Sequence, residues 1–286
     1  MKIISQAGEE RREERDLISH QTTQLMSGGL KMTLMRIKER QKHIEDSRPE
    51  DKTCPECNRV FTPVWDHYEE RWKYPDLTED GTCNTCKRLN HIRENIEEYL
   101  RRAGVPPKYL KCTFDNFKLT RENRHPFRVC KDYVETPGSS LFLYGPYGTG
   151  KTHLAVAITR ELLLKGREVI FISVPRLLFE IRKAFREDSH AESDYVERYT
   201  SIEYLILDDF GVEKTTEWAR QTLNYIIYER DNYLKPTVIT SNLSLDEISE
   251  KLDGRISSRI SGMGKVIQLK GEDFRIKLRK TDRYRR

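Results

Sequence analysis

One stretch of the sequence, residues 141–152, constrains the fold most strongly. It reads LFLYGPYGTGKT, an apolar run followed by a glycine-rich turn that ends in Lys151 and Thr152. Because glycine has no Cβ atom, such a turn can curl its backbone N–H groups round a phosphate, and a helix N-terminus adds partial positive charge. The spacing G-x-x-x-x-G-K-T between an apolar run and an apolar-periodic segment predicts a P-loop that binds a nucleoside triphosphate.

The side chains of this loop have separate expected roles. Lys151 is expected to reach the β- and γ-phosphates of ATP, and the Thr152 hydroxyl to ligate Mg²⁺. The other residues expected to contact the nucleotide are Gly145, Pro146, Tyr147, Gly148, Thr149, Gly150 and His153.

From residue 140 onward, apolar strands and amphipathic helices alternate. Continuous apolar strands between helices indicate a parallel sheet that is covered on both faces, and therefore a three-layer α/β domain. The expected strands are 140–145, 168–173, 203–208, 237–241 and 265–269, and the expected helices are 151–165, 175–187 and 216–233.

Acidic and amide side chains follow two of these strands. Asp208 follows four apolar residues in EYLILDDFG and is expected to be the Walker B carboxylate that holds Mg²⁺. Asp209 stands where such ATPases usually have a glutamate that polarises the attacking water, and aspartate is one methylene shorter. Asn242, in TVITSN, is expected to contact the γ-phosphate and this water, while Ser244 is the better candidate for a helix N-cap.

Four cysteines form a second motif, C-x₂-C-x₂₅-C-x₂-C. Two C-x-x-C pairs can direct four thiolates to one point, which predicts a closed, structural Zn²⁺ site. The ligands would be Cys54, Cys57, Cys83 and Cys86. A redox pair, free thiols, or replacement of one cysteine by His67 or His91 are the alternatives.

The composition excludes some classes of protein. No apolar run approaches the roughly 20 residues of a membrane span, and the N-terminal residues lack the long apolar region of a secretory signal. We therefore expect a cytoplasmic protein with no membrane partner and with reduced thiols. Residues 270–286 carry eight Lys/Arg and three Asp/Glu, a net charge of +5, which suits either a contact with nucleic acid or an acidic partner, or a solvated tail.

Five short motifs in a fixed order carry a family resemblance. GPYGTGKT, LILDDFG, TSN, RISSRI and GEDFR together resemble the DnaC/DnaI helicase-loader and IstB branch of AAA+ ATPases, over about residues 105–280. The resemblance implies nucleotide-dependent assembly into a homo-oligomer, single-stranded DNA binding, and a protein client held by the N-terminal part. By motif matching, Arg259 takes the arginine-finger position, Arg255 that of its companion, and Arg275 that of the second sensor.

With the resemblance, the expected fold is an AAA+ P-loop three-layer ATPase domain preceded by a Cys₄ zinc module and an N-terminal helix. A helix over 30–46 would either dock a partner or pack on the zinc module. The expected segments are 1–50, charged, helical and partly disordered; 51–104, the zinc module; 105–280, the ATPase domain; and 281–286, a basic tail.

The leading functional hypothesis is an ATP-dependent loader of a replicative DNA helicase, with weak ATP hydrolysis stimulated by DNA or assembly. An IstB-like partner of a transposase, and a nucleotide-switched DNA-binding scaffold, are the alternatives. The helix over 175–187 is expected to contact single-stranded DNA through basic residues, although its aromatic residues could instead belong to the core. These residues are Arg176, Arg182, Lys183 and Arg186, interleaved with Phe179 and Phe185.

Overall fold

The computed structural model describes residues 28–187, 189–211 and 216–274. The chain divides into two compact units, residues 1–87 and 88–286. The expected partly disordered start of the chain, Arg275 and the basic tail lie outside the described residues. Among the described residues, no helix has the length and apolar composition needed to cross a bilayer.

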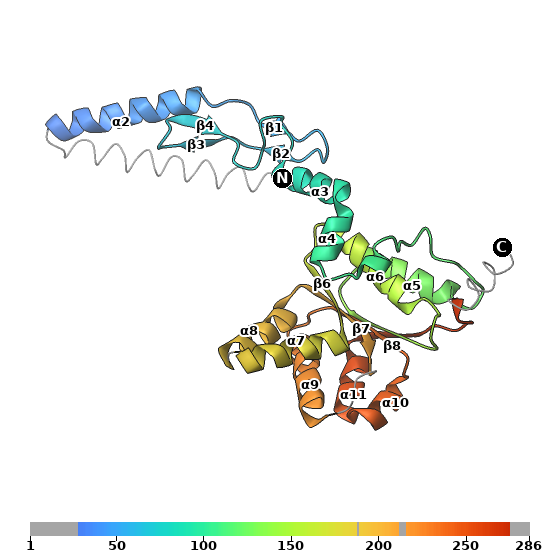
Figure 1. Cartoon of the computed structure of the whole chain (residues 1–286). Coiled ribbons are helices and arrows are strands. Elements are labelled where there is room, and N and C mark those ends of the chain that lie inside the picture. Colours follow the sequence, from blue (N-terminus) through green and yellow to red (C-terminus); the bar gives the residue numbers. More distant parts are fainter. Residues whose placement is uncertain (1–27, 188, 212–215, 275–286) are drawn as a thin grey trace, which may run out of the picture. The chain divides into compact units, whose positions relative to one another are not determined.

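Within the described part of residues 88–286, five parallel strands form one sheet in the order β6-β7-β8-β5-β9 (Figure 1). All five predicted strands are confirmed, each within two residues at either end. They are β5 (Ser140–Tyr144), β6 (Val169–Ser173), β7 (Tyr204–Phe210), β8 (Thr237–Ser241) and β9 (Gly264–Gln268). Strand β8 lies between β5, which enters the P-loop, and β7, which carries the two acids.

Helices cover both faces of this sheet, as predicted for a three-layer domain. Alternate residues of one strand enter different cores: Leu141 and Leu143 lie in one, and Phe142 lies in the other. The first core is formed by α4 (Ile96–Arg102), α5 (Arg124–Glu135) and α6 (Lys151–Leu164). The second is formed by α7 (Val174–Glu187), α8 (Ser189–Ser201), α9 (Glu217–Asn232), α10 (Leu245–Lys251) and α11 (Gly254–Met263).

The segment after α4 covers the outer edge of the sheet. The N–H of Phe171, on edge strand β6, donates to the carbonyl oxygen of Ala103 at 2.7 Å. A Cβ atom at Gly104 would lie 2.3 Å from the Phe171 carbonyl oxygen, so only glycine allows this approach. Leu100 and Ala103 are buried in the first core, and the two compact units meet at residue 87/88. The expected domain boundary at 104/105 stays a prediction.

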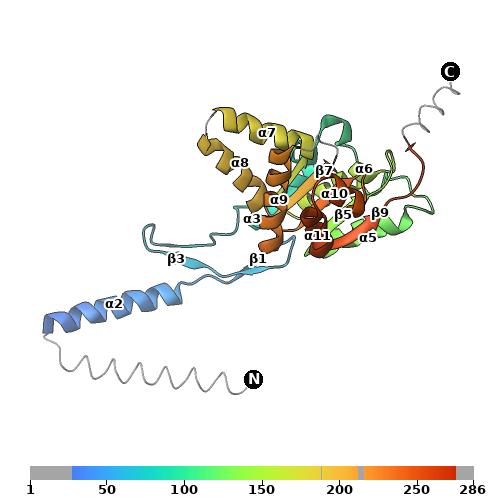
Figure 2. The same ribbon diagram turned by 90° about the horizontal axis from the view of Figure 1, so that it is seen from below.

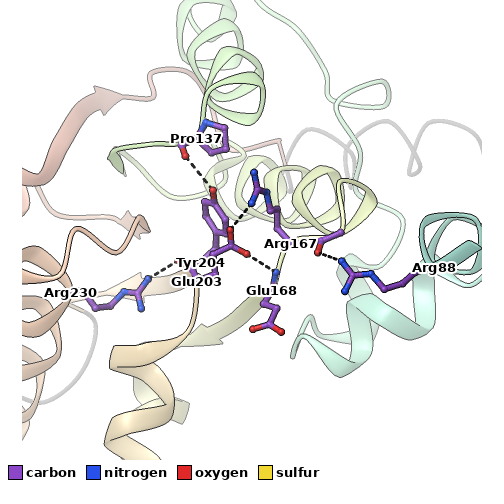
Figure 3. Close-up of polar contacts among 8 residues, drawn as sticks. Arg88, Pro137, Arg167, Glu168, Glu203, Tyr204 and Arg230 are labelled. Atoms are coloured by element: carbon purple, nitrogen blue, oxygen red, sulfur yellow. Dashed lines mark hydrogen bonds and ion pairs between the residues drawn. The ribbon is translucent and has the colours of Figure 1, made fainter. Parts of the chain in front are cut away.

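A network of polar contacts lies at the end of the sheet where the strands begin (Figure 3). Arg230 is fully buried and donates to Thr237 Oγ1 at 2.8 Å and to the Pro236 carbonyl oxygen at 2.7 Å. Burial lowers the pKa of Arg230 to about 10, so the side chain is still charged at neutral pH. Next to it, the Glu203 carboxylate accepts from Arg167 Nη1 at 3.0 Å and from the Glu168 N–H at 3.2 Å. This edge of the sheet is therefore occupied by structural contacts.

The first unit contains short antiparallel ladders and one long helix. Strand β1 (Lys52–Thr53) pairs with β2 (Val60–Phe61), and β3 (Val64–Asp66) pairs with β4 (Arg71–Lys73). Helix α3 (Asn84–Glu94) begins at the second cysteine pair, as predicted, and η1 (Pro107–Tyr109) is a short turn in the second unit.

The predicted N-terminal helix is confirmed as α2 (Gly28–Asp46). Its Arg40 pairs with Glu70, and Trp72 Nε1 donates to Ser47 Oγ just beyond its end at 3.3 Å. Ile37 of its apolar stripe is nevertheless exposed. These two polar contacts join the helical segment to the hairpin, and docking of a partner on the apolar stripe stays a hypothesis.

Candidate nucleotide site and metal centre

The P-loop glycines are required by the positions of their neighbours. Gly145, Gly148 and Gly150 all have positive φ, at 144°, 71° and 98°. A Cβ atom at Gly145 would lie 2.0 Å from the Leu269 carbonyl oxygen, and one at Gly150 would lie 2.7 Å from the Phe117 ring. Any side chain at these positions would therefore displace the backbone or the ring that packs on the loop.

Lys151 is held inside the loop. Its side chain is 6% exposed, and Nζ donates to the carbonyl oxygens of Gly145 at 2.7 Å and Pro146 at 2.8 Å. Thr149 Oγ1 also donates to the Pro146 carbonyl oxygen, at 2.9 Å. The loop thus keeps a desolvated ammonium group beside backbone N–H groups at a helix N-terminus, which is a suitable environment for phosphate oxygens.

The structure brings the two predicted magnesium ligands together, although they are 56 residues apart. Thr152 Oγ1 donates to Asp208 Oδ1 at 3.0 Å, and Thr240 Oγ1 donates to the same oxygen at 2.6 Å. Asp208 is 5% exposed, and burial is the main cause that raises its pKa to about 6. A desolvated carboxylate beside a hydroxyl is a favourable site for a hard cation such as Mg²⁺.

Asp209 lies in a β-bulge. The register of β7 against β8 shifts between Leu207 and Phe210, so that Asp208 and Asp209 together face Thr240. Asp209 has φ 57°, its side chain is exposed, and its N–H donates to Thr240 Oγ1 at 3.1 Å. Bulges of this kind re-aim side chains and are frequent near active sites.

The remaining predicted residues occupy different places. Asn242 directly follows β8 and is half-buried at the same edge of the sheet as the acids, whereas Ser244 caps α10 in a capping box with Glu247. His153 Nε2 lies 2.8 Å from the Thr113 carbonyl oxygen and packs edge-on against Phe117. Its contact with nucleotide stays a prediction.

The two arginines of α11 differ in their surroundings. Arg255 is exposed. The guanidinium carbon of Arg259 lies 4.6 Å from the ring centre of Tyr228, and Nη1 lies 3.8 Å from Asp231 Oδ2, so this side chain rests against α9 of its own chain.

Sequence reasoning missed three residues at the site. Thr240 contacts both acids, Phe117 packs on the P-loop at Gly150, and the Asp273 carboxylate lies beside Gly148. The Phe274 N–H also donates to the Gly148 carbonyl oxygen at 3.2 Å. The run of hydroxyl side chains in TVITSN was the available signal for Thr240, and Asp273 lies in the GEDFR motif; for Phe117, the sequence contains no comparable pattern.

The four cysteines of the first unit lie together. Their Sγ atoms are all within 4.8 Å of one another, and Cys57 Sγ lies 3.8 Å from Cys83 Sγ. Four sulfurs around a tetrahedral Zn²⁺ with Zn–S bonds of about 2.3 Å would be separated by about 3.8 Å. Backbone N–H donors, first that of Cys83, lower the pKa of Cys54, whereas the side-chain hydrogen bond with Cys83 and burial raise the pKa of Cys86.

Neither candidate histidine belongs to this cluster. His67 is exposed, and His91 Nδ1 lies 3.1 Å from the Tyr99 hydroxyl oxygen. The donor set is therefore Cys₄, which fits the closed structural type of zinc site.

Comparison with known proteins agrees with this geometry. Residues 87–282 match the family of IstB-like ATP binding proteins. The chain belongs to this family. The match begins at the boundary between the two units, so all four cysteines of the cluster precede it. The predicted resemblance and the AAA+ fold class are confirmed.

Individual relatives of this IstB-like chain point to replication proteins. It is 28% identical over 176 residues to the replicative helicase loader DnaC of Escherichia coli (strain K12), which covers 59% of this chain and 72% of DnaC. The crystal structure of the DnaC helicase loader superposes with a TM-score of 0.53 at 26% identity, over 58% of this chain and all of that one. The replication initiator DnaA bound to AMPPCP and single-stranded DNA gives a TM-score of 0.53 at 26% identity, over 59% and 52%.

The buried carboxylate generates a prediction about stability. The raised pKa of Asp208 means that ionisation destabilises the nucleotide-free fold; this cost is absent below about pH 4, grows as the pH rises through about 6, and is complete above it. Asp208→Asn keeps an oxygen acceptor without the charge. It should stabilise the nucleotide-free protein by about 1–3 kcal/mol at pH 7.5 and by much less at pH 4.5, measured by urea unfolding.

Asp209→Asn is the matched control, because it removes a neighbouring charge from an exposed position. An Asp208→Asn variant no more stable than this control at pH 7.5 would contradict the prediction.

Proposed function

We propose that this chain is an ATP-dependent loader of a replicative DNA helicase, which binds single-stranded DNA and hydrolyses ATP in an assembled state. The observation that carries the proposal is the Thr152–Asp208 contact at 3.0 Å, between the ends of a P-loop and a buried acidic strand. Similarity to the helicase loader DnaC supports the choice of client. The IstB-like family description leaves a transposase as the second candidate client.

The residues of the site suit ATP and Mg²⁺. Lys151 would neutralise charge on the β- and γ-phosphates, and Thr152 and Asp208 would hold the metal. Bound Mg²⁺ would polarise the phosphate oxygens and so favour phosphoryl transfer to water. Asp209 and Asn242 are the residues proposed to orient that water.

Hydrolysis in an assembled state rests on Arg259. Tyr228 and Asp231 hold its guanidinium at the surface of α9 through a cation–π contact and a long ion pair. Arg259 and Asp231 are half-buried, and contacts of this kind contribute about 0.5–2 kcal/mol each, so a stronger interaction with a neighbour's phosphates could replace them. Arg259 is therefore proposed to act in trans within a nucleotide-dependent homo-oligomer.

The surface over α7 and α8 is the proposed contact with single-stranded DNA. The two helices pack side by side (Figure 2) and enclose a hollow of about 450 Å³. Its lining includes Lys183, Arg198 and Phe179, which is 67% exposed, and also Arg176, which forms an ion pair with Glu180 at 2.8 Å. Basic groups beside an exposed aromatic ring suit phosphates and stacked bases.

Phe179 is therefore not part of the core. Its side chain is exposed, while Leu177 and Ile181 on the same helix are buried. Arg182 lies over the Trp218 ring, at 4.5 Å from its centre, and is partly engaged with α9. The side chains of Phe185 and Arg186 lie outside the described residues.

The Cys₄ cluster is proposed to bind one Zn²⁺ that holds the first unit together. The buried apolar residues around it are few, namely the cysteines themselves with Phe61 and Leu77 packed against them. A core of this size cannot fold a module alone, whereas metal binding supplies folding free energy directly. The first unit is proposed to bind the client protein.

Lys151→Ala should weaken ATP binding about 10–100-fold and abolish turnover, because a charged hydrogen-bond donor to the phosphates is lost. Equilibrium binding and phosphate release measure the two effects, and affinity purification in ATP then identifies the client. Lys165→Ala, just beyond the end of the same helix, is the control. Recovery of a hexameric helicase with wild type but not with Lys151→Ala supports the loader; recovery of a transposase favours the second candidate.

Lys183→Glu with Arg198→Glu should weaken single-stranded DNA binding at least tenfold, while ATP binding is unchanged. The slope of the logarithm of the DNA-binding constant against the logarithm of salt concentration should become shallower by about one to two. Fluorescence anisotropy with a labelled oligonucleotide measures both quantities. Arg128→Glu with Lys131→Glu makes the same charge change on α5, which lies on the other face of the sheet. Equal losses in the two double variants would refute a localised DNA surface on α7 and α8.

Protein purified without chelator should contain one zinc per chain by elemental analysis, and Cys54→Ser should lose it. That variant should become sensitive to proteolysis between residues 50 and 87 while the ATPase unit keeps its thermal transition. Cys112→Ser, a thiol outside the cluster, should change neither property. Wild-type protein without zinc would exclude the metal site.

A further inference from the structure

The end of β8 holds the two acids of the site in place through a single hydroxyl group. We propose that Thr240 is the positioning residue for both Asp208 and Asp209, and that its hydroxyl sets how well the pair serves Mg²⁺ and the attacking water. This inference rests on the proposed ATP hydrolysis and adds a residue that neither the P-loop nor the acidic motif contains.

The geometry at Thr240 uses both capacities of a hydroxyl group at once. Its hydrogen is donated to Asp208 Oδ1 at 2.6 Å, and its oxygen accepts from the Asp209 N–H at 3.1 Å. Thr240 is fully buried, so water does not compete for either bond. A valine of the same shape could make neither bond, and both polar partners would lose their side-chain partner on β8.

The bulge explains why a side chain is needed here. Ladder pairing runs from Leu207 opposite Ile239 to Phe210 opposite Ser241, and two residues of β7 face Thr240 in between. The extra residue interrupts the backbone ladder and takes a left-handed conformation at Asp209, φ 57°. The Thr240 hydroxyl provides the Asp209 N–H with an acceptor in place of a backbone carbonyl, and so fixes the direction of the bulge.

The neighbouring residue completes the link to the P-loop. Ser241 Oγ donates to the Phe210 carbonyl oxygen at 2.7 Å, and the Ser241 carbonyl oxygen accepts from the Gly145 N–H at 3.2 Å. Consecutive residues of β8 thus bind the bulge and the first P-loop glycine. Of the two hydroxyls, that of Thr240 is the one that contacts a carboxylate.

Thr240 and Thr152 play different parts at Asp208. Both donate to Oδ1, but Thr152 is also the hydroxyl expected to bind Mg²⁺. Thr240 lies on β8 and is not expected to bind Mg²⁺ itself. Partners that orient a metal-binding carboxylate in this way commonly change metal affinity or activity 10–100-fold when they are removed.

Thr240→Val tests the inference, since it keeps the β-branched shape and removes the hydroxyl. We expect kcat to fall about 10–100-fold and the Mg²⁺ concentration for half-maximal turnover to rise about tenfold, with ATP binding in the absence of Mg²⁺ unchanged. Thr240→Ser restores the hydroxyl and should recover both values to within about threefold of wild type.

Thr237→Val is the matched control. Thr237 lies at the other end of β8, is equally buried, and its hydroxyl oxygen accepts from Arg230 Nε. It should lower the unfolding temperature while kcat and the Mg²⁺ requirement stay within about twofold of wild type. Equal kinetic losses in Thr237→Val and Thr240→Val, or wild-type kinetics in Thr240→Val, would overturn the positioning role.

A separate readout distinguishes this inference from the proposed hydrolysis. If wild type and Lys151→Ala show the same turnover, the proposed ATP hydrolysis is refuted. The positioning role of Thr240 is then tested by measuring the binding of a fluorescent ATP analogue with and without Mg²⁺. In wild type, Mg²⁺ should raise the affinity for the analogue, and in Thr240→Val this Mg²⁺-dependent gain in affinity should be about tenfold smaller. Undiminished tightening in that variant would overturn the inference on its own terms.

Discussion

Two buried charges of opposite sign lie at opposite ends of the sheet, Arg230 where the strands begin and Asp208 where the strands end, at the candidate nucleotide site. At the edge where the strands begin, Arg230 donates to six acceptors among the described residues, five of them backbone carbonyl oxygens. At the edge where the strands end, Asp208 accepts from the hydroxyls of Thr152 and Thr240. Burial lowers the pKa of the arginine and raises that of the aspartate.

The two charges differ in how completely the protein compensates them. A guanidinium has five N–H groups, and the carbonyl oxygens around Arg230 engage them from several sides, so this charge is satisfied by the fold itself. A carboxylate has about four acceptor positions, and two hydroxyls leave room for a cation. The compensated charge therefore stabilises the structure, while the partly compensated one costs stability and has acceptor positions left for the proposed Mg²⁺. Such a cost is typical of functional sites.

Local sequence patterns predicted most of this architecture, because the features concerned lie within one element. The apolar runs of the five strands and the glycines of the P-loop act over a few neighbouring residues. The bulge, in contrast, depends on residues of two different strands. The sequence predicts a strand over 203–208 that stops at Asp208, whereas β7 continues to Phe210 through a register shift against β8. That shift depends on which strand lies next to β7, so neither the bulge nor the role of Thr240 could be predicted from the sequence. The role of Gly104 could not be predicted for the same reason, since its close approach to Phe171 depends on which strand lies beside it.

The register shift also bears on the one departure from the usual ATPase pattern. An aspartate in place of glutamate loses one methylene of reach, if the backbone at that position is unchanged. In this chain the backbone is changed, because Asp209 has left the pleat of β7 and its left-handed conformation turns the side chain out of the sheet. In the proposed hydrolysis, the reach of its carboxylate toward the attacking water would be set jointly by side-chain length and by the bulge, whose Asp209 N–H donates to Thr240. A shorter acid and a bulged strand therefore act together at this site, and the residue type alone does not determine how far the Asp209 carboxylate reaches.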